Sequence, residues 1–170
     1  MINFQNDILP LKDKLFRLAL RITQNHAEAE DVVQETMIKV WNRRDQWHQI
    51  ESVEAFCLTI CRNLSIDRQR HNDNPMWSNM PPATDPEDLS YASNPEQIAI
   101  GHDRIRMVHQ LIAQLPEKQR TAMELRDIEG KSYKDIATIM DITEEQVKVN
   151  IFRGRKTVRE RFLMLTTEKK

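Results

Sequence analysis

Apolar residues recur at helical spacing along most of the chain, and the pattern near the C-terminus is the most informative. One apolar stripe there follows the spacing 0, 3, 4 and 7 and is formed by Tyr133, Ile136, Ala137 and Met140. Thr143 is followed three residues later by Gln146, a capping box that starts a second helix near Glu144. The buried side of this second helix is expected to consist of Val147, Ile151, Val158 and Phe162. The pattern predicts two helices joined by a tight turn.

The second of these helices has a basic outer surface. Between Lys148 and Arg161 there are six basic residues, and Glu160 is the only acidic one. This arrangement is typical of a helix-turn-helix whose second helix enters the major groove of DNA. An amphipathic hairpin with solvated charges is the alternative interpretation. The excess of one sign of charge, together with Phe152 on the basic surface, favours DNA binding.

Three further helices are predicted in the N-terminal part, at about residues 5–24, 25–44 and 53–70. Asn25 is the expected N-cap of the second helix, with Glu28 as its capping-box partner. The side of that helix expected to face the core is formed by Val33, Met37, Val40 and Trp41. Its outward side carries Asp31, Gln34, Glu35, Ile38 and Asn42. An acidic surface with an isoleucine at its centre fits either docking to a basic protein or a solvated helix face, and these residues alone leave both open.

The third helix combines apolar anchors with polar residues suited to nucleic acid. Phe56, Ile60 and Leu64 are its expected anchors. Its C-terminal part carries Arg62, Asn63, Asp67, Arg68, Arg70 and His71. Trp41 and Trp47 precede it in the sequence. Aromatic rings beside cationic side chains are the ingredients of a surface that binds single-stranded nucleic acid.

A segment without helical period separates two helical regions. Residues 72–93 contain four prolines and no basic residue, which indicates a linker. Two more helices are predicted beyond it, from Pro95 (with Asn94 as N-cap) to about Gln114 and from Pro116 to near Gly130. The expected fold is therefore all-α: two small helical domains, residues 1–71 and 95–170, joined by a flexible acidic linker, residues 72–94. The C-terminal domain contains the helix-turn-helix.

Composition agrees with this architecture, and the charge is unevenly distributed. The chain has 170 residues, of which 39% are hydrophobic and 30% charged, as in globular proteins. Its formal net charge of −1 hides six acidic and no basic residues in 72–103, and fifteen basic and ten acidic residues in 104–170. No apolar stretch approaches the roughly 20 residues of a membrane span, and the N-terminus lacks an export signal. A cytoplasmic location is therefore expected.

Cys57 and Cys61 are the only cysteines and lie four residues apart, on one face of a helix. As metal ligands they would need partners, such as His71 or His102. The apolar residues around them favour ordinary core positions, so we expect no metal and no cofactor. The sequence also lacks a glycine-rich phosphate loop and a nucleophile motif. An enzyme is the least favoured class, and no small-molecule substrate is expected.

Three segments, in this order, resemble a bacterial RNA polymerase sigma factor of the extracytoplasmic-function (ECF) group of the sigma-70 family. Residues 29–41 are similar to the polymerase-binding helix of that family, and residues 56–68 to its promoter-melting helix. Residues 115–120 and 130–155 are similar to its C-terminal DNA-reading domain. The resemblance covers about residues 8–165. It implies a protein that binds core RNA polymerase and directs promoter-specific initiation of transcription.

The resemblance also implies roles for individual residues of the N-terminal domain. Within Asp31 to Arg44, the residues implied to bind the clamp helices of the largest polymerase subunit are Asp31, Gln34, Glu35, Ile38 and Asn42. The residues implied to capture the melted −10 element are Trp47, Arg62, Asn63, Asp67, Arg68 and Arg70. Asn63 matches the position that lines a pocket for a flipped-out base. An amide suits that position because it offers one donor and one acceptor to a base edge.

The helix-turn-helix, from Tyr133 to Phe152 and beyond, is implied to read the −35 element as duplex DNA. The implied contact residues are Gln146, Lys148, Val149, Asn150, Phe152, Arg153, Arg155 and Lys156. In the family the linker passes through the RNA exit path, and many members are held inactive by an anti-sigma factor. Core polymerase, promoter DNA and an anti-sigma factor are therefore the expected partners. Retention at the inner membrane by an anti-sigma factor is the alternative to a free cytoplasmic location.

Two other functions fit part of the pattern. A conventional transcription regulator needs a ligand pocket or a phosphoacceptor site, and the N-terminal half suggests neither. A helical adaptor that binds only proteins has no use for the basic helix at 147–161. The chain also departs from the family. Asp141 stands where many members have Gly in the turn, and Val149 and Asn150 replace small polar and basic residues, which indicates an unusual −35 sequence.

Overall fold

The computed structural model describes residues 1–72 and 95–167, with the backbone alone for 95–100. The predicted linker lies outside the described residues except for Asn72, which ends a helix. The N-terminal half contains α1 (Lys12–Thr23), α2 (His26–Asn42) and α3 (Val53–Asn72), which pack on one another in all three pairs. Shorter helical turns lie at Phe4–Ile8, Leu9–Leu11 and Arg44–Gln49. The single predicted helix at 5–24 is divided because Pro10, which lacks an N–H, lies in the tight turn before α1.

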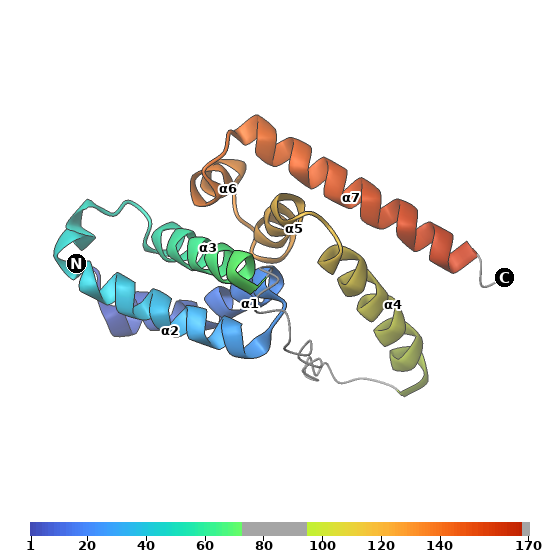
Figure 1. Cartoon of the computed structure of the whole chain (residues 1–170), viewed down its shortest axis with the longest axis horizontal. Helices are drawn as coiled ribbons and strands as arrows, with labels where there is room; N and C mark the ends of the chain where they lie inside the picture. Colours follow the sequence, from blue (N-terminus) through green and yellow to red (C-terminus); the bar gives the residue numbers. More distant parts are fainter. Residues whose placement is uncertain (73–94, 168–170) are drawn as a thin grey trace.

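The C-terminal half is built around the long helix α7. Its elements are α4 (Pro95–Ala113), α5 (Glu117–Met123), a π-helical turn (Glu124–Ile128), α6 (Tyr133–Met140) and α7 (Glu144–Thr167). α7 contacts α4, α5 and α6, and α6 with α7 forms the predicted helix-turn-helix (Figure 1). The described residues are helical or connect helices, and no strand occurs among them. The expected all-α class is confirmed.

Capping side chains set the start of α2 and α7, for which capping boxes were predicted, whereas the cap predicted at Asn94 lies outside the described residues. The Gln146 N–H donates to Thr143 Oγ1 at 3.2 Å, and the Thr143 N–H donates to Gln146 Oε1 at 3.0 Å, so this box is complete. At α2, Asn25 accepts from the Glu28 N–H at 3.1 Å, as predicted. The reciprocal half is absent, because the Glu28 carboxylate binds Arg68 instead. That part of the prediction was wrong.

The turn between α6 and α7 uses a left-handed residue. Asp141 adopts φ 53° and ends α6, the position at which many proteins place Gly. Asp is among the few non-glycine residues that visit this region readily, since its short polar side chain bonds locally. The turn of this helix-turn-helix is therefore formed with Asp141 in place of the more usual glycine.

The residues predicted for the core are buried or half-buried, with one exception. Val158 and Phe162, predicted for the buried side of α7, are only half-buried. Val33 and Val40 of α2 are almost completely inaccessible, whereas Trp41, predicted to face the core, is 47% exposed. Cys57 and Cys61 are fully buried in α3, and burial raises the pKa of each thiol to about 12. They are core residues, as expected. Within the described residues, no group of three or more histidine, cysteine or carboxylate side chains could hold a metal ion.

The two halves pack against each other rather than standing apart. α3 contacts α6, and α1 contacts both α5 and the π-helical turn (Figure 1). Their buried apolar residues form one continuous cluster, which extends from Ile8 and Leu15 to Ile136 and Ile151. The sequence pattern did not predict this contact. Both halves therefore share part of their hydrophobic core.

Candidate nucleic-acid interface

The outward face of α7 is set by how closely the helix packs on α5. Val147, Ile151 and Gly154 form its buried line. A Cβ at Gly154 would lie 2.5 Å from the Met123 sulfur and 3.5 Å from the Gln119 Cβ. Glycine therefore lets α7 approach α5 at this point. The side chains on the opposite side of α7 project into solvent.

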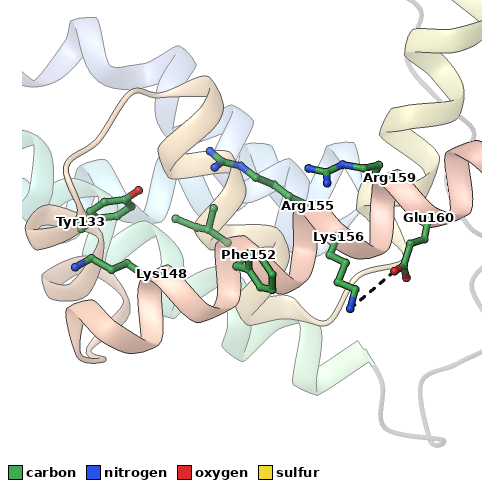
Figure 2. A pocket seen from close by; sticks show the side chains of 8 residues that line it. Tyr133, Lys148, Phe152, Arg155, Lys156, Arg159 and Glu160 are labelled. Carbon is green, nitrogen blue, oxygen red and sulfur yellow. Dashed lines mark ion pairs between the residues drawn. The ribbon is translucent and has the colours of Figure 1, made fainter.

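That exposed side carries cations around an exposed aromatic ring. Phe152 is 68% exposed and Val149 44% exposed. One flank of α7 is hollowed by a volume of about 560 Å³ (Figure 2), lined by Tyr133, Lys148, Ile151, Phe152, Arg155, Lys156, Arg159 and Glu160. Glu160 is the one acidic side chain there, 3.9 Å from Lys156. A basic hollow beside a protruding helix suits the phosphate backbone of duplex DNA.

Neighbouring elements hold two of these cations in place. Asp127, in the π-helical turn, accepts a hydrogen bond from Arg155 Nε at 3.1 Å, and this bond raises the pKa of Arg155. The Arg126 guanidinium and the Lys148 ammonium lie 4.7 Å and 5.6 Å from the centre of the Tyr133 ring. Such contacts reduce the freedom of long side chains. Arg155 and Lys148 are thus positioned before any ligand arrives.

The other flank of α7 contains the residues expected to contact bases. A second hollow, of about 280 Å³, is lined by Lys118, Ile142, Glu145, Gln146, Val149, Asn150 and Arg153. Asn150 Nδ2 donates to the Gln146 carbonyl at 2.8 Å, and Gln146 Oε1 serves in the cap, so part of the polar capacity of both is already used. Arg153 is exposed and makes no hydrogen bond or ion pair within the described part of the chain. Its N–H donors are therefore not used by other residues that the structure describes.

The outward face of α2 is exposed as predicted. Asp31, Gln34 and Asn42 are exposed, and Ile38 is 59% exposed at the centre of this surface. Glu35 lies 3.3 Å from Lys39 and 3.2 Å from Arg68. Partial desolvation opposes ionisation, but the hydrogen bonds from these two cations hold the pKa of Glu35 below its ordinary value. We call the five residues Asp31, Gln34, Glu35, Ile38 and Asn42 the α2 surface.

Some of the predicted contact residues of α3 are exposed, and others are engaged in ion pairs within the protein. Asn63, Asp67 and Arg70 are exposed. Arg68 lies 3.0 Å from Glu28 and 3.9 Å from Asp31, and so neutralises carboxylates on and beside the α2 surface. The structure thereby joins residues that the sequence had assigned to two separate sites.

Arg62 is covered by α5 of the C-terminal half. Its side chain is buried, and its Nη2 lies 3.3 and 3.4 Å from the two carboxylate oxygens of Glu117 in α5. Its Nε has no hydrogen-bond partner among the described residues. In this arrangement Arg62 is not accessible to a nucleic acid. The predicted contact of Arg62 with DNA requires α5 to move away.

An aromatic cluster lies between α2 and the turn that follows it. Trp47 is half-buried, and its Nε1 donates to the Val40 carbonyl at 3.1 Å. Trp41 packs edge-to-face on Trp47 and on Phe4, with ring centres 6.2 and 5.4 Å apart. The Arg44 guanidinium stacks 5.1 Å from the Trp41 ring. Trp41 with Arg44 therefore forms a more accessible stacking surface than Trp47. Their separation of three residues, across the end of α2, was the signal in the sequence that could have indicated this pair.

Models of known protein families match both halves of the chain. The family model described as Sigma-70 region 2 matches residues 8–74, and that described as Sigma-70, region 4 matches residues 105–158. The chain is 32% identical over 169 residues to the RNA polymerase sigma-H factor of Pseudomonas aeruginosa, covering 89% of this chain and 83% of that protein. It is 30% identical over 156 residues to the ECF RNA polymerase sigma factor SigW of Bacillus subtilis, covering 88% and 83%. The chain belongs to the ECF group of the sigma-70 family.

A further relative of this sigma factor is longer. It is 34% identical over 158 residues to the ECF RNA polymerase sigma factor SigE of Mycolicibacterium smegmatis, matching 87% of this chain but only 57% of that protein. Among solved structures, the sigma factor RpoE bound to the anti-sigma factor NepR from Bartonella quintana has the same fold. Its TM-score is 0.76 at 24% identity, with 95% of this chain and 96% of that chain covered.

The family match assigns the two candidate surfaces of this sigma factor to different regions. The α2 surface and the aromatic cluster lie in region 2, and the basic face of α7 lies in region 4. Asp127, Arg126 and Glu117 were not singled out from the sequence, although they position or cover predicted contact residues. Among the described helices, none is long and apolar enough to cross a membrane.

Proposed function

We propose that this protein binds core RNA polymerase and directs promoter-specific initiation of transcription. The observation that carries the proposal is the order of its parts: a region 2 match, a region 4 match, and in the latter a helix-turn-helix whose α7 presents exposed cations. The aromatic cluster in the first part suits melted DNA, and the second part suits duplex DNA.

The α2 surface is the proposed contact with polymerase. Its carboxylates, Asp31 and Glu35, would meet basic side chains on the clamp helices of the largest subunit, and the exposed Ile38 supplies an apolar centre. A polar rim around an apolar centre is the usual composition of a specific protein interface. Such an arrangement supports docking over a merely solvated helix face.

The N-terminal domain is proposed to capture bases of the −10 element after they leave the duplex. Stacking on an aromatic ring contributes roughly 1–3 kcal/mol per base, which is enough to hold a strand that opens transiently. Asn63 is exposed at the face of α3 that would meet such a base. No acid or base on this chain takes part, so we propose that it has no catalytic activity of its own. We propose that it acts on polymerase and DNA in the cytoplasm and that it has no small-molecule substrate.

An anti-sigma factor is the third proposed partner. The fold matches that of RpoE bound to NepR, and also that of CnrH bound to the cytosolic domain of CnrY, with a TM-score of 0.65 at 17% identity. The latter match covers 92% of this chain and 85% of CnrH. A chain with two small domains offers such a partner two surfaces to hold at once.

Transcription in vitro tests the proposal. Core polymerase is incubated with a pool of genomic fragments, with and without this protein, and the transcripts are sequenced. We expect defined start sites only when the protein is present, and their loss with the Glu35→Lys, Ile38→Asp variant. Binding to DNA without binding to core polymerase would instead identify a conventional transcription regulator. Binding to neither would contradict the proposed function.

A further inference from the structure

Two apolar side chains stand together on the exposed face of α7, among its cations. Val149 is 44% exposed and Phe152 is 68% exposed, and their separation of three residues makes them neighbours on the helix surface. Val149 lines the smaller hollow and Phe152 the larger one, so the two side chains lie between the hollows. Figure 2 shows Phe152 projecting from α7 between Lys148 and Lys156. We call Val149 and Phe152 the apolar ridge.

The surroundings of the apolar ridge indicate what covers it. Lys148 and Lys156 lie in the hollow on one side and Arg153 in the hollow on the other, which favours a polyanion over an apolar protein surface. The ridge also belongs to the second helix of a helix-turn-helix, the helix that enters the major groove. In that groove the apolar group on a base edge is the C5 methyl group of thymine. A thymine methyl is therefore the part of duplex DNA that can pack on the ridge.

The polar neighbours of Val149 are partly engaged within the protein. Asn150 Nδ2 donates to the Gln146 carbonyl at 2.8 Å, and Gln146 Oε1 accepts from the Thr143 N–H at 3.0 Å. Each of these amides keeps only part of its hydrogen-bonding capacity for a base. Apolar contact by Val149 can supply discrimination that this reduced set of hydrogen bonds does not, because it depends on the shape of the base edge.

The spacing of Val149 and Arg153 sets the distance between the bases that they can reach. The two residues are four positions apart in α7 and line the same hollow. Four residues of α-helix rise about 6 Å, and two base-pair steps of duplex DNA rise about 7 Å. An arginine in the major groove pairs with guanine through the N7 and O6 acceptors. Bases contacted by these two side chains would therefore lie about two base pairs apart.

We propose that Val149 is a specificity-determining residue of this sigma factor: it selects a thymine in the −35 element through the C5 methyl group. Phe152 excludes water from this contact, and the thymine lies about two base pairs from the guanine that Arg153 contacts. Thymine and uracil present the same hydrogen-bonding groups and differ in this methyl alone, so the selection extends to thymine over uracil. The inference rests on the DNA-binding part of the proposed function and does not depend on binding to polymerase.

Selection from random-sequence duplexes tests the preference without a known promoter. One pool is synthesised with thymine and a second with uracil in its place, and each is selected with the full-length protein, alone and with core polymerase. We expect the thymine pool to yield a motif with a thymine about two base pairs from a guanine. The uracil pool should lose enrichment at the thymine position and keep it at the guanine. Equal enrichment of thymine and uracil, or the absence of any motif, would overturn the proposal.

The same selection separates this inference from the proposed function. A thymine-dependent motif selected by a protein that does not bind core polymerase would reject the proposed function and leave the role of Val149 standing. Transcription from defined start sites, with thymine and uracil equally effective in the −35 element, would do the reverse.

Variants of Val149 show which side chain reads the methyl group. Affinity is measured on a selected duplex and on the same duplex with uracil at the single thymine position. The natural protein should bind the uracil duplex about fourfold more weakly, the factor expected from burial of one methyl group. Val149→Ala should reduce this difference to below about twofold, and Val149→Ile should retain it.

Ile105→Ala is the matched control, because it removes a comparably exposed apolar side chain from α4. This variant should discriminate between the two duplexes as the natural protein does. A full preference for thymine that survives Val149→Ala, in a protein with unchanged helical circular dichroism, would overturn the assignment to Val149. Loss of the preference in Ile105→Ala would show that the effect is not specific to the apolar ridge and would overturn it equally.

Discussion

Arg68 Nη2 lies 3.2 Å from Glu35 Oε2, so the helix predicted to hold the −10 strand is bonded to the surface predicted to bind polymerase. Arg68 also reaches Glu28 at 3.0 Å and Asp31 at 3.9 Å. A basic partner on the α2 surface competes with Arg68 for these carboxylates, and a phosphate competes with them for Arg68. Because each binding event weakens the bonds that oppose the other, polymerase and the −10 strand are expected to bind cooperatively.

Replacement of Arg68 tests whether its ion pairs with the carboxylates of α2 stabilise the protein. Arg68→Gln leaves Glu28, Asp31 and Glu35 without their shared cation, and should lower the free energy of unfolding by up to about 1 kcal/mol, as for partly exposed ion-pair networks. Arg70→Gln removes the same charge from the same helix end, where Arg70 is exposed, and should change stability little. Urea unfolding measures both. Equal losses of unfolding free energy in the two variants would show that the ion pairs of Arg68 add no stability of their own.

Glu124 gives the fold a pH dependence of defined sign. The carboxyl is buried, and desolvation raises its pKa to about 7, against 4.5 for the ordinary group, despite Arg21 at 3.1 Å. Arg17 and Glu129 are the other charged groups that act on it. The folded protein therefore holds this proton more tightly than the unfolded chain, and the stability so gained is lost as pH rises from 4.5 through 7.

Comparison with Glu124→Gln isolates that contribution. Between pH 5 and pH 8 the natural protein should lose about 2–3 kcal/mol of unfolding free energy relative to the variant, from the size of the pKa change. Denaturant titrations at several pH values measure the difference. A constant difference between the two proteins across this range would mean that Glu124 titrates normally.

The two helical glycines should respond oppositely to alanine. At Gly154 an added Cβ meets the Met123 sulfur at 2.5 Å and its Cγ at 3.3 Å, so α7 must move from α5 or Met123 must repack. We expect Gly154→Ala to cost about 1–3 kcal/mol of stability, as overpacked cores do. Gly101, in α4, has nothing within 4 Å of the same position. Gly101→Ala should stabilise by about 0.5–1 kcal/mol through helix propensity, and thermal unfolding separates the two cases.

Two neighbouring cations of α7 should affect promoter binding differently. Arg153→Ala is expected to weaken binding to promoters with a −35 element by about 1–3 kcal/mol and to spare initiation where that element is missing. Lys156→Ala should reduce affinity equally for all sequences and lower the salt slope by about one. Affinity measured on duplexes with and without the −35 element distinguishes the two. An equal loss on both duplexes after Arg153→Ala would reject base contact by this residue.

Local patterns in the sequence determined the helices and their caps. The stripe through Ile136 and Met140, and the box between Thr143 and Gln146, were predicted from residues a few positions apart and are present in the structure. Helical period and capping depend on neighbours within one or two turns, so a single sequence contains this information. The same holds for the outward face of α2 and the basic face of α7.

Only the tertiary structure decided which charges meet. Arg62 pairs with Glu117 across 55 positions of sequence, and Arg155 with Asp127 across 28. A chain with 25 basic and 26 acidic residues offers many alternative pairings of equal local merit. The choice is made when α3 packs on α6 and α1 on α5, because burial of apolar surface fixes which side chains face each other. The sequence by itself thus determined the surfaces of each domain, and the packing between domains determined that one of these surfaces is covered.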